Sequence, residues 1–415
     1  MDAAARARAK RHPTTASELS SQSTEVSSKE AKDSERAAAA AMAAAMAAAA
    51  ANSASSPERA EFDRRYEFLK MLAEGAFGTV WSGRDRDKVR RREQVVKVAI
   101  KVVMHGGEDT ELVRNEVKMH QKLFTGGGSP LLVRLFDVLF EEARAMLVVE
   151  LCDGEALCEL LDKAPRGRLP EACAAPIVRQ LCTALAFMHA KHVAHLDVKP
   201  ENVLVHSRQS GSSEPRLRLL DYGSACAMDR PDAPALGLVQ DFGGTDRYMA
   251  PERLALPNLN GSRWFGGAPA DIYSLGSVVL HVLLGGGAAD ALATKAAAMA
   301  KAAEAAATAR AKVSKATAAA APRARQLSQT MATAAESAAA EAGSAAAQVE
   351  ATLAEVDVRL SVPAMDFLLM VTRVEPTERP AAPDLLRHEW LLERRTRCKG
   401  GLTEREVALP AVCLS

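Results

Sequence analysis

The sequence lacks the features that mark nucleic-acid-binding, zinc-binding or disulfide-rich proteins. Its 53 basic and 52 acidic residues leave a formal net charge of +1, so charge gives no reason to expect a nucleic-acid partner. Its seven cysteines include no Cys-x-x-Cys pair, which argues against a zinc site and against a disulfide framework. Free cysteines are typical of reducing compartments, and we therefore expect an intracellular protein, most simply a cytoplasmic one.

Long apolar runs are also missing, and both ends of the chain are poor in core-forming residues. Residues 1–60 hold few aromatic side chains and many Ala, Ser and charged residues, so we expect a disordered arm. Its Ala-rich run 37–51 is 15 residues long, too short and too weakly apolar to span a bilayer. The Arg- and Ala-rich start leaves an organelle transit peptide open. Residues 394–415 form a tail in which Cys413 stands third from the end, which excludes a prenylation signal.

The most informative stretch is residues 195–202, His-Leu-Asp-Val-Lys-Pro-Glu-Asn. It places Lys199 two residues and Asn202 five residues after Asp197. A carboxylate, an ammonium group and an amide at these spacings can face one phosphate and its metal ion from a single tight loop. The spacing therefore favours phosphoryl transfer, provided that the other parts needed for this reaction occur in order.

Two upstream segments supply such parts. Residues 74–80, Glu-Gly-Ala-Phe-Gly-Thr-Val, are typical of a glycine-rich turn between two strands, where Gly75 and Gly78 let backbone N–H groups approach phosphates. Residues 98–101, Val-Ala-Ile-Lys, are typical of a buried strand that carries Lys101. Alone, the turn is a weak signal, and a strand lysine is as often a surface charge whose stem lies along apolar side chains. The order in which the segments occur favours phosphoryl transfer more strongly than any one of them alone.

In that order the segments resemble the eukaryotic protein kinase family, serine/threonine type. The resemblance implies an α+β fold of two lobes over residues 66–393. The β-rich N-lobe, with a helix called αC in this family, spans 66–149, and the helical C-lobe spans 150–286 and 356–393. ATP is then the phosphate donor and Mg2+ the metal ion.

The resemblance also implies roles for individual residues. Asp197 orients the acceptor hydroxyl, Lys199 steadies the γ-phosphate, and Lys101 contacts the α- and β-phosphates. Further nucleotide contacts fall on Ala73, Gly75, Gly78, Val80, Ala99, Val149, Glu150 and Cys152. Ala73 replaces the first glycine of the family's turn. Val149 is the gatekeeper beside the adenine, and its small size predicts an open space behind the base.

The ion-pair partner of Lys101 has two candidates in the amphipathic segment 111–123. These are Glu111 and Glu116. Glu116 is followed by Val-x-Met-x-x-x-Leu, which resembles the passage from αC to the next strand in the family. We therefore predict that Glu116 pairs with Lys101 and that Glu111 is a solvated charge.

Two aspartates compete for the metal ion. Asp241 belongs to a literal Asp-Phe-Gly, but it lies only 11 residues before Glu252 of the Ala-Pro-Glu motif, too few for an activation segment. Asp221, in Asp-Tyr-Gly, lies 31 residues before Glu252 and follows the strand-like run 217–220. We assign the metal ion to Asp221 and Asn202.

The later motifs resemble structural parts of the C-lobe. Asp271 is expected to brace the catalytic loop, and Arg379 is expected to pair with Glu252. Between them lies the Ala-dominated segment 287–355, which has few large apolar residues to bury. We expect it to be a solvated helical or disordered insertion, and a docking arm for a partner is the alternative.

The acceptor preference follows from two residues of the active-site pattern. Lys199 after the aspartate and Thr245 in Gly-Thr-x-x-Tyr both resemble serine/threonine kinases. Glu155 and Glu201 resemble positions that attract substrate arginines, so protein substrates with basic flanking residues are expected. His281 stands where a third acidic residue would be, which weakens that expectation.

The regulatory features point away from loop phosphorylation. Leu196 replaces the arginine that pairs with a phosphorylated loop residue in many kinases, and residues 225–244 contain no Ser, Thr or Tyr. Leu196 and the run 223–225 look most like the calcium/calmodulin-dependent and death-associated kinase group. No basic amphipathic helix follows Leu391, so the sequence does not support calmodulin binding.

Two other classes of function stay open at the level of sequence. A pseudokinase would keep the fold as a binding or scaffold module without turnover, although Lys101, Asp197, Asn202 and Asp221 are all in place. An interaction protein would act through its Ala-rich arms, so that deleting 287–355 abolishes function while Asp197→Asn does not. The physiological substrate, the upstream regulators and the oligomeric state do not follow from the sequence.

Overall fold

A computed structural model describes ten stretches of the chain: 56–75, 78–90, 94–104, 109–206, 215–228, 238–240, 243–254, 264–291, 293–294 and 360–392. The predictions for most of the N-terminal arm and the insertion, and for the tail, fall outside these residues. The chain divides into two compact units, Met1–Glu74 with Thr79–Val96, and Gly75–Gly78 with Lys97–Ser415. The αC helix and the strands from Lys97 onward thus belong to the same unit as the C-lobe.

The first unit holds a short helix and two paired strands, namely α2 (Pro57–Arg65), β1 (Tyr66–Gly75) and β2 (Gly78–Arg90). Ser56 caps α2 by accepting a hydrogen bond from the N–H of Arg59. The ring of Phe62 packs on Tyr66, with centroids 4.8 Å apart, and Arg65 donates two hydrogen bonds to the buried carboxylate of Asp85. These contacts fasten the helix to the strand pair.

The second unit begins with the remaining N-lobe elements: β3 (Gln94–Met104), α3 (Asp109–Phe124), β4 (Leu135–Phe140) and β5 (Arg144–Glu150). β5 pairs antiparallel with β3 on one side and with β4 on the other. Val113 and Val117 on one face of α3 pack with Val103, Ala145 and Leu147 in a small apolar core. The strand predicted to carry Lys101 and the predicted αC helix are both present.

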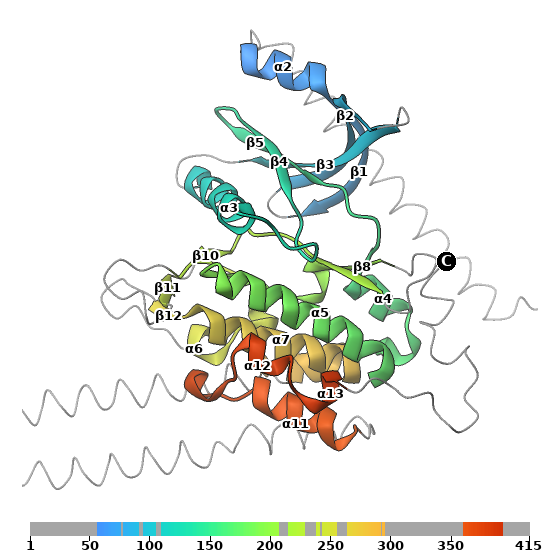
Figure 1. The fold of residues 1–415 in the computed structure, drawn as a ribbon, viewed down its shortest axis with the longest axis vertical. Helices are drawn as coiled ribbons and strands as arrows, with labels where there is room; N and C mark the ends of the chain where they lie inside the picture. Colours follow the sequence, from blue (N-terminus) through green and yellow to red (C-terminus); the bar gives the residue numbers. More distant parts are fainter. Residues whose placement is uncertain are drawn as a thin grey trace, which may run out of the picture. The chain divides into compact units, whose positions relative to one another are not determined.

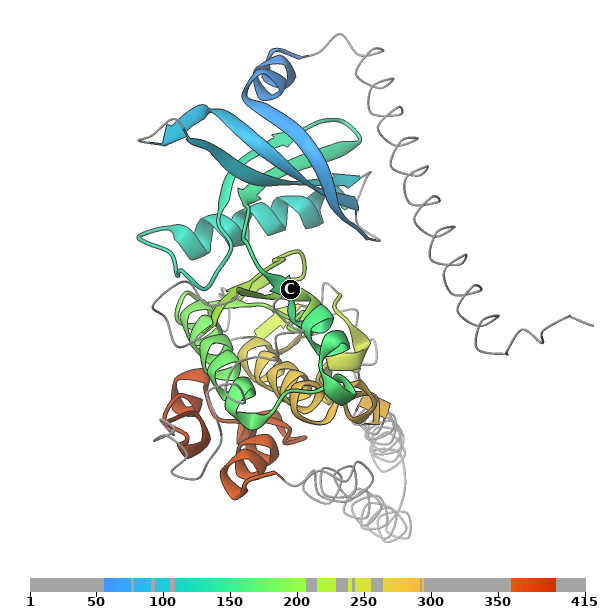
Figure 2. The ribbon, with the colours of Figure 1, turned by 90° about the vertical axis from the view of Figure 1, so that its right-hand side faces the viewer.

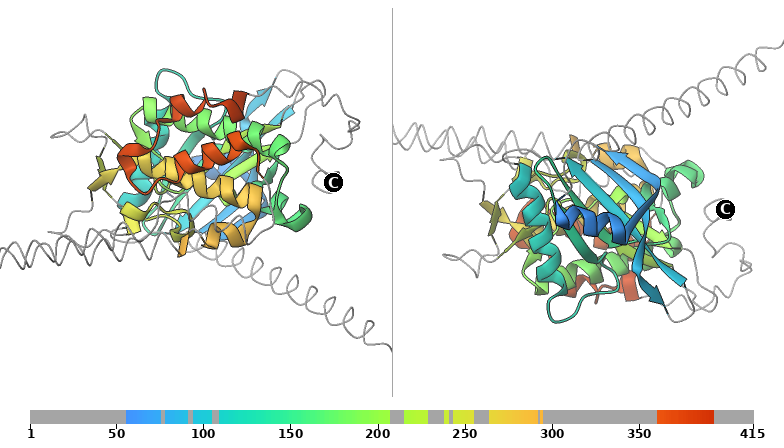
Figure 3. Two further views of the ribbon diagram at one scale, coloured as in Figure 1. Left: turned by 90° about the horizontal axis from the view of Figure 1, so that it is seen from below. Right: turned by 90° about the horizontal axis from the view of Figure 1, so that it is seen from above.

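The C-lobe is mainly helical and carries short two- and three-stranded sheets. Its elements are β6 (Glu155–Ala156), α4 (Leu157–Lys163), α5 (Glu171–Ala190), β7 (Val193–Ala194), β8 (Val203–His206), β9 (Arg216–Leu219), β10 (Cys226–Ala227), β11 (Leu238–Gln240), α6 (Pro251–Leu254), β12 (Trp264–Gly266), α7 (Gly267–Leu284), α11 (Val362–Val371), α12 (Ala382–Leu385) and α13 (Glu389–Leu392). α5 and α7 lie side by side in Figures 1 and 2. Seen from below in Figure 3, α11 to α13 lie over these two helices. The described residues therefore form the predicted α+β kinase fold, with a β-rich N-lobe and a helical C-lobe.

α7 explains why one helix of this chain has the length and hydropathy of a membrane span. It is the single helix of the described part that meets these criteria, and 83% of its apolar window is buried inside the molecule. A helix that is apolar on all sides is needed wherever other elements surround it, as α5 and α11 do here. Its composition is thus accounted for by its place in the C-lobe core.

The short sheets bring the two predicted functional loops together. β8 pairs antiparallel with β9, so the loop before β8 and the turn after β9 meet at the same end. There, the N–H of Leu220 donates to the carbonyl of Asn202 at 2.8 Å. β10 pairs with β7, with Cys226 opposite Ala194. The chain that follows Asp221 is therefore tied to the strand that precedes Asp197.

Candidate active site

Three charged side chains from three different elements meet at one point, and we call them the charged cluster: Lys101, Glu116 and Asp221. The ammonium group of Lys101 lies 2.8 Å from Glu116 Oε1 and 2.8 Å from Asp221 Oδ1. Of the two candidate glutamates, Glu116 makes this contact, whereas Glu111 is exposed and lies 3.9 Å from Arg114. The cluster joins β3, α3 and the turn after β9.

The charges of Lys101 and Asp221 stabilise each other against the cost of burial, whereas burial, with the charge of Asp221 adding to it, raises the pKa of Glu116 above its usual value. Burial opposes the charge on Lys101, but the two carboxylates outweigh it and raise the pKa of the lysine above its usual value. For Asp221, burial alone would raise the pKa, whereas the charge and hydrogen bond of Lys101 and the N–H of Gly223 lower it to about 2. Lys101 is therefore a cation and Asp221 an anion at neutral pH.

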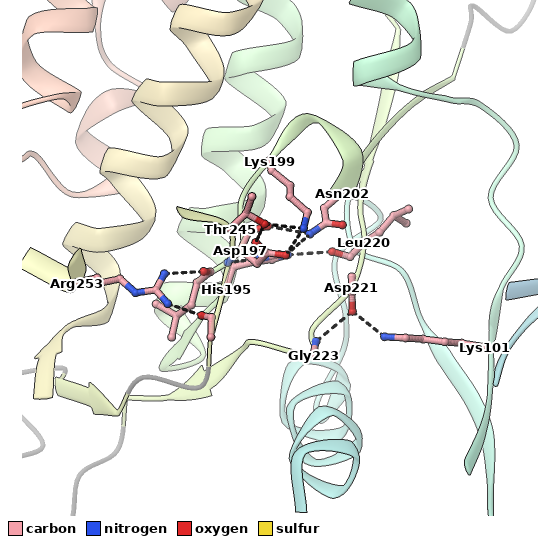
Figure 4. A network of polar contacts seen from close by, with 12 residues as sticks. Lys101, His195, Asp197, Lys199, Asn202, Leu220, Asp221, Gly223, Thr245 and Arg253 are labelled. Carbon is pink, nitrogen blue, oxygen red and sulfur yellow. Dashed lines mark hydrogen bonds and ion pairs between the residues drawn. The ribbon is translucent and has the colours of Figure 1, made fainter. Parts of the chain in front are cut away.

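The turn that carries Asp221 has an uncommon backbone conformation. Asp221 has φ +57°, in the left-handed region, and its Oδ1 accepts a hydrogen bond from the N–H of Gly223 at 3.2 Å. This local bond compensates for the unfavourable dihedral and points the carboxylate toward Lys101 (Figure 4). Residues 241–242 lie outside the described part, so the rival Asp241 has no described position.

A second group of side chains surrounds Asp197, and we call it the acceptor cluster: Asp197, Lys199, Asn202 and Thr245. The hydroxyl of Thr245 donates to Asp197 Oδ1 at 2.7 Å and accepts a hydrogen bond from Lys199 at 2.8 Å. Lys199 lies 2.8 Å from Asp197 Oδ2, which also accepts a hydrogen bond from Asn202 at 3.0 Å. The contact of Thr245 with both residues, expected from its motif, is present (Figure 4).

The loop that carries the acceptor cluster is fixed from below by Asp271. Its carboxylate is fully buried and accepts hydrogen bonds from the N–H groups of His195 and Leu196, at 2.8 and 2.7 Å, and contacts His189 Nε2 at 2.8 Å. Burial alone would raise the pKa of Asp271, but the hydrogen bond of His189 and the other contacts lower it. The predicted brace is thus an anion that holds two consecutive backbone donors.

A group of three aromatic rings links α3 to both loops. The ring of Tyr222 lies between His120, with centroids 4.5 Å apart, and His195, with centroids 5.9 Å apart. The hydroxyl of Tyr222 donates to the carbonyl of Val133 at 3.2 Å, which supplies the partner that a buried tyrosine requires. Sequence analysis missed His120, although its spacing of four residues from Glu116 places it on the same face of α3.

The nucleotide positions predicted on the strands lie on two different units. Ala73 and Val80 belong to the first unit, on β1 and β2. In the second, Ala99 pairs in register with Val149, the predicted gatekeeper. Gly78 has φ +136°, and a Cβ there would come within 1.9 Å of the carbonyl oxygen of Val102, so only glycine fits this close backbone approach.

Two predicted nucleotide positions, Glu150 and Cys152, lie at and just after the end of β5. Glu150 pairs with Arg218 of β9 at 3.1 Å. Burial raises the pKa of the Cys152 thiol to about 11, with Glu150 adding to the effect, so the thiol is protonated at neutral pH. The exposed Gly75, at the end of β1, has open space around its Cα.

Arg253 is the second residue of this region that sequence analysis missed. It follows the Ala-Pro-Glu motif directly and is 2% exposed. Its guanidinium donates to the carbonyls of Leu196, at 2.7 Å, and Gly243. An arginine next to a motif glutamate carries no sequence signal of burial, because arginine is mostly exposed. By contrast, the neighbouring ion pair of Glu252 with Arg379, at 2.6 and 2.8 Å, was predicted and is present.

The sequence matches the protein kinase domain family over residues 66–391, and the chain belongs to this family. It is similar to CBL-interacting protein kinase 19 of Oryza sativa subsp. japonica, at 34% identity over 228 residues, 54% of this chain and 39% of the relative. It is also similar to CBL-interacting protein kinase 4 of the same organism, at 38% identity over 226 residues, 54% of this chain and 44% of the relative.

A bacterial protein is among the relatives as well. Serine/threonine-protein kinase pkn2 of Myxococcus xanthus is 30% identical over 230 residues, 55% of this chain and 25% of the relative. The matched part is less than half the length of each of these three relatives. The similarity therefore concerns the kinase domain, which these proteins share with the present chain.

Proposed function

We propose that the protein transfers the γ-phosphate of ATP to serine or threonine hydroxyls of protein substrates. The observation that carries this proposal is the contact of one protein hydroxyl, that of Thr245, with both Asp197 and Lys199. A carboxylate that accepts from a hydroxyl, beside an ammonium group that donates to it, is the arrangement that an acceptor hydroxyl needs. The names of the relatives agree with this class of reaction.

The mechanism assigns one task to each group of residues. Asp197 accepts the hydrogen bond of the acceptor hydroxyl, aims its oxygen at the γ-phosphorus and takes its proton late in the transfer. Lys199, next to it, stabilises the negative charge on the transferred phosphoryl group. Lys101, held as a cation by Glu116, binds the α- and β-phosphates. Catalysis is thus positioning and charge stabilisation, which together supply most of the rate gain in such reactions.

The donor set near Asp197 fits Mg2+. The Asp221 carboxylate is ionised, and Asn202 uses its NH2 group for two bonds to Asp197, so its amide oxygen is the atom left to face a metal ion. Mg2+ prefers such hard oxygen ligands. Asp221 and Asn202 would hold it, and when bound it neutralises phosphate charge. Lys101 would then share Asp221 with the ion.

We also propose a moderate preference for basic residues beside the acceptor. Glu201 is exposed on the catalytic loop, whereas the carboxylate of Glu155 is already in contact with Lys163. His281 accepts or donates a hydrogen bond with the Tyr248 hydroxyl at 2.9 Å, and burial and the charge of Arg247 lower its pKa, so it adds no charge of its own. Glu201 is then the main acidic contact, and Glu201→Gln should reduce the preference for arginine on a peptide array.

The proposal includes activity without phosphorylation of the activation segment. Leu196 has no charge to offer a phosphate, and no Ser, Thr or Tyr stands between 225 and 244. We place the domain nearest to the calcium/calmodulin-dependent and death-associated group, without calmodulin regulation. The test is to express the protein in a host that lacks protein kinases, treat it with phosphatase and assay a basic peptide. Activity that appears only after an upstream kinase modifies residues 221–252 would refute this part.

The decisive experiment for the function is a peptide-array phosphorylation assay with purified protein and its Asp197→Asn variant. We expect phosphate on Ser and Thr peptides with the wild type and almost none with the variant. The alternative, a pseudokinase that acts as a scaffold, predicts ATP binding without phosphate transfer in both proteins. Activity that survives Asp197→Asn would contradict the assigned role of this residue.

A further inference from the structure

Arg253 joins the catalytic loop to the end of the activation segment through two backbone carbonyl groups. From α6 its Nη1 donates to the carbonyl of Leu196 at 2.7 Å, and its Nη2 donates to the carbonyl of Gly243. Figure 4 shows both bonds. Because a guanidinium is planar and rigid, these two bonds fix the spacing between the catalytic loop and the end of the activation segment.

On the loop side, the bond acts on the residue that precedes Asp197. Leu196 has φ +63°, a left-handed conformation that is unfavourable for a non-glycine residue. Its N–H donates to Asp271, its carbonyl accepts from Arg253, and its side chain is 1% exposed. Asp271 and Arg253 thus hold the peptide groups on either side of a strained residue, and Asp197 comes next.

At the activation segment, Arg253 bonds to the carbonyl of Gly243, two residues before Thr245. Gly243 and Gly244 have φ +106° and +145°, and a Cβ on Gly244 would lie 2.8 Å from Leu196 O and 3.1 Å from Arg253 Nη2. The segment therefore passes so close to the loop that glycine is required. Thr245, which bonds to Asp197 and Lys199, is placed by this close passage.

The same guanidinium also contacts the strand pair that holds the middle of the segment. Its carbon lies 5.1 Å from the ring centroid of Phe265, in the range of a cation–π contact. Phe265 of β12 stands opposite Val239 of β11, and β11 belongs to the activation segment. Arg253 thus contacts the catalytic loop, the end of the segment and the strand that pairs with its middle.

We infer that Arg253 is a positioning residue that keeps the activation segment in its productive place without a phosphate. With Leu196, Gly243 and Phe265 it forms what we call the arginine anchor. In many kinases a phosphorylated loop residue performs this task by pairing with the arginine beside the catalytic aspartate, a position that is Leu196 here. The inference rests on the proposed kinase function, and it assigns to α6 a role that the sequence pattern did not indicate.

The test uses the full chain, treated with phosphatase, and compares Arg253→Met with the wild type. We expect kcat to fall about 10-fold or more, because two hydrogen bonds of a charged group are lost, while KM for ATP changes less than about threefold. The charged cluster, which would bind ATP, lies on other elements, namely β3, α3 and the turn after β9. Arg253→Lys, which keeps the charge but not the planar fork, should recover part of kcat.

A second variant guards against misfolding of the first. Gly244→Ala keeps Arg253 but introduces a Cβ into the close contact, so it should also lower kcat with little change in KM for ATP. The matched control is Arg379→Met, which removes the other buried arginine of this region. It should lower the melting temperature, but kcat of the folded protein, measured well below that temperature, should stay within about threefold.

Three results would overturn the anchor. Unchanged kcat in both Arg253→Met and Gly244→Ala is one, and an equal kcat loss in Arg379→Met is another, because the effect would then be general support of α6. If the wild type phosphorylates no peptide, the proposed function fails, and hydrogen exchange then tests the anchor separately. Exchange in residues 195–198 and 243–246 should be about 10-fold faster or more in Arg253→Met, and identical exchange is the third overturning result.

Discussion

The charged cluster and the acceptor cluster perform neighbouring tasks but are built in different ways. Lys101, Glu116 and Asp221 come from three elements, and two ion pairs of Lys101 hold them together. In the acceptor cluster, Asp197, Lys199 and Asn202 come from one short loop, and an ion pair and hydrogen bonds link them. Thr245 reaches them from the activation segment. The first cluster therefore depends on the position of α3, whereas the second is nearly complete within its loop.

The largest expected effect is on kcat and tests whether Asp221 of the charged cluster or Asp241 holds the metal ion. Asp221→Ala removes the carboxylate that contacts Lys101 and would hold the metal ion, so we expect kcat to fall by roughly 10³-fold or more. Asp241→Ala should keep most of the activity. The measurement is the rate of phosphate transfer to a Ser/Thr peptide at saturating MgATP. Equal losses in the two variants would show that the assignment of the metal ion is wrong.

The next effect tests the one link of the acceptor cluster to the activation segment. Thr245→Ala removes a hydroxyl that bonds to Asp197 and Lys199, and hydrogen bonds to charged groups contribute about 1.5–3 kcal/mol. We expect kcat to fall about 10- to 100-fold with little change in the affinity for ATP. Thr245→Ser is the control, because it keeps the hydroxyl and should retain most of kcat. If Thr245→Ala is as active as the wild type, the loop does not need this contact.

A third, smaller effect concerns the strand beside the charged cluster. Val149 lies on β5 opposite Ala99 and is small, so the wild type should bind adenine-like ligands that carry a bulky group behind the base. Val149→Met and Val149→Phe should weaken such ligands about 10-fold or more, because overpacking a filled site is costly. Dissociation constants from titration provide the measurement, with ATP as the control ligand. Equal affinities in all three proteins would contradict the alignment of β5.

The two clusters also show what sequence analysis can recover. Motif spacing was sufficient for Lys101 with Glu116, for the brace Asp271 and for Glu252 with Arg379, because these residues stand at fixed places in a family pattern. It was not sufficient for Arg253, whose partner Leu196 is 57 residues away and is bound through its backbone carbonyl. Every residue has a backbone carbonyl that can accept a hydrogen bond, so the type of the partner residue does not indicate the contact. The pairing of β11 with β12 was missed for a similar reason, since three-residue strands have too little alternation to be recognised.

The burial of polar side chains was the second feature that could not be predicted from the sequence. From its place in an amphipathic helix His120 would be expected at the surface, but it is 3% exposed and its ring packs against Tyr222. Whether a polar residue on such a helix is buried depends on what the rest of the chain places against it. Here that is the turn after β9, about 100 residues further along the sequence.

The smallest expected effect is on stability and concerns His120, next to the charged cluster. Burial, and then the charge of Lys101, lower its pKa to about 3, against an unfolded value near 6.5. Nearby, Asp221 acts in the opposite direction but is outweighed. Above pH 6.5 neither state binds a proton at this site, so there is no effect. Below it the unfolded chain takes up a proton that the folded protein does not, so stability falls as the pH falls toward 3.

The size of the effect is at most about 1.4 kcal/mol for each pH unit below 6.5. His120→Leu and His120→Gln cannot titrate, so their unfolding free energies should fall less between pH 7 and pH 5 than that of the wild type. Urea denaturation at the two pH values measures this difference. Two non-titrating variants of different polarity separate the effect of the proton from the effect of packing. A change in packing should alter the unfolding free energy equally at pH 7 and at pH 5. If the wild type and both variants lose the same stability between pH 7 and pH 5, His120 is not the group that titrates.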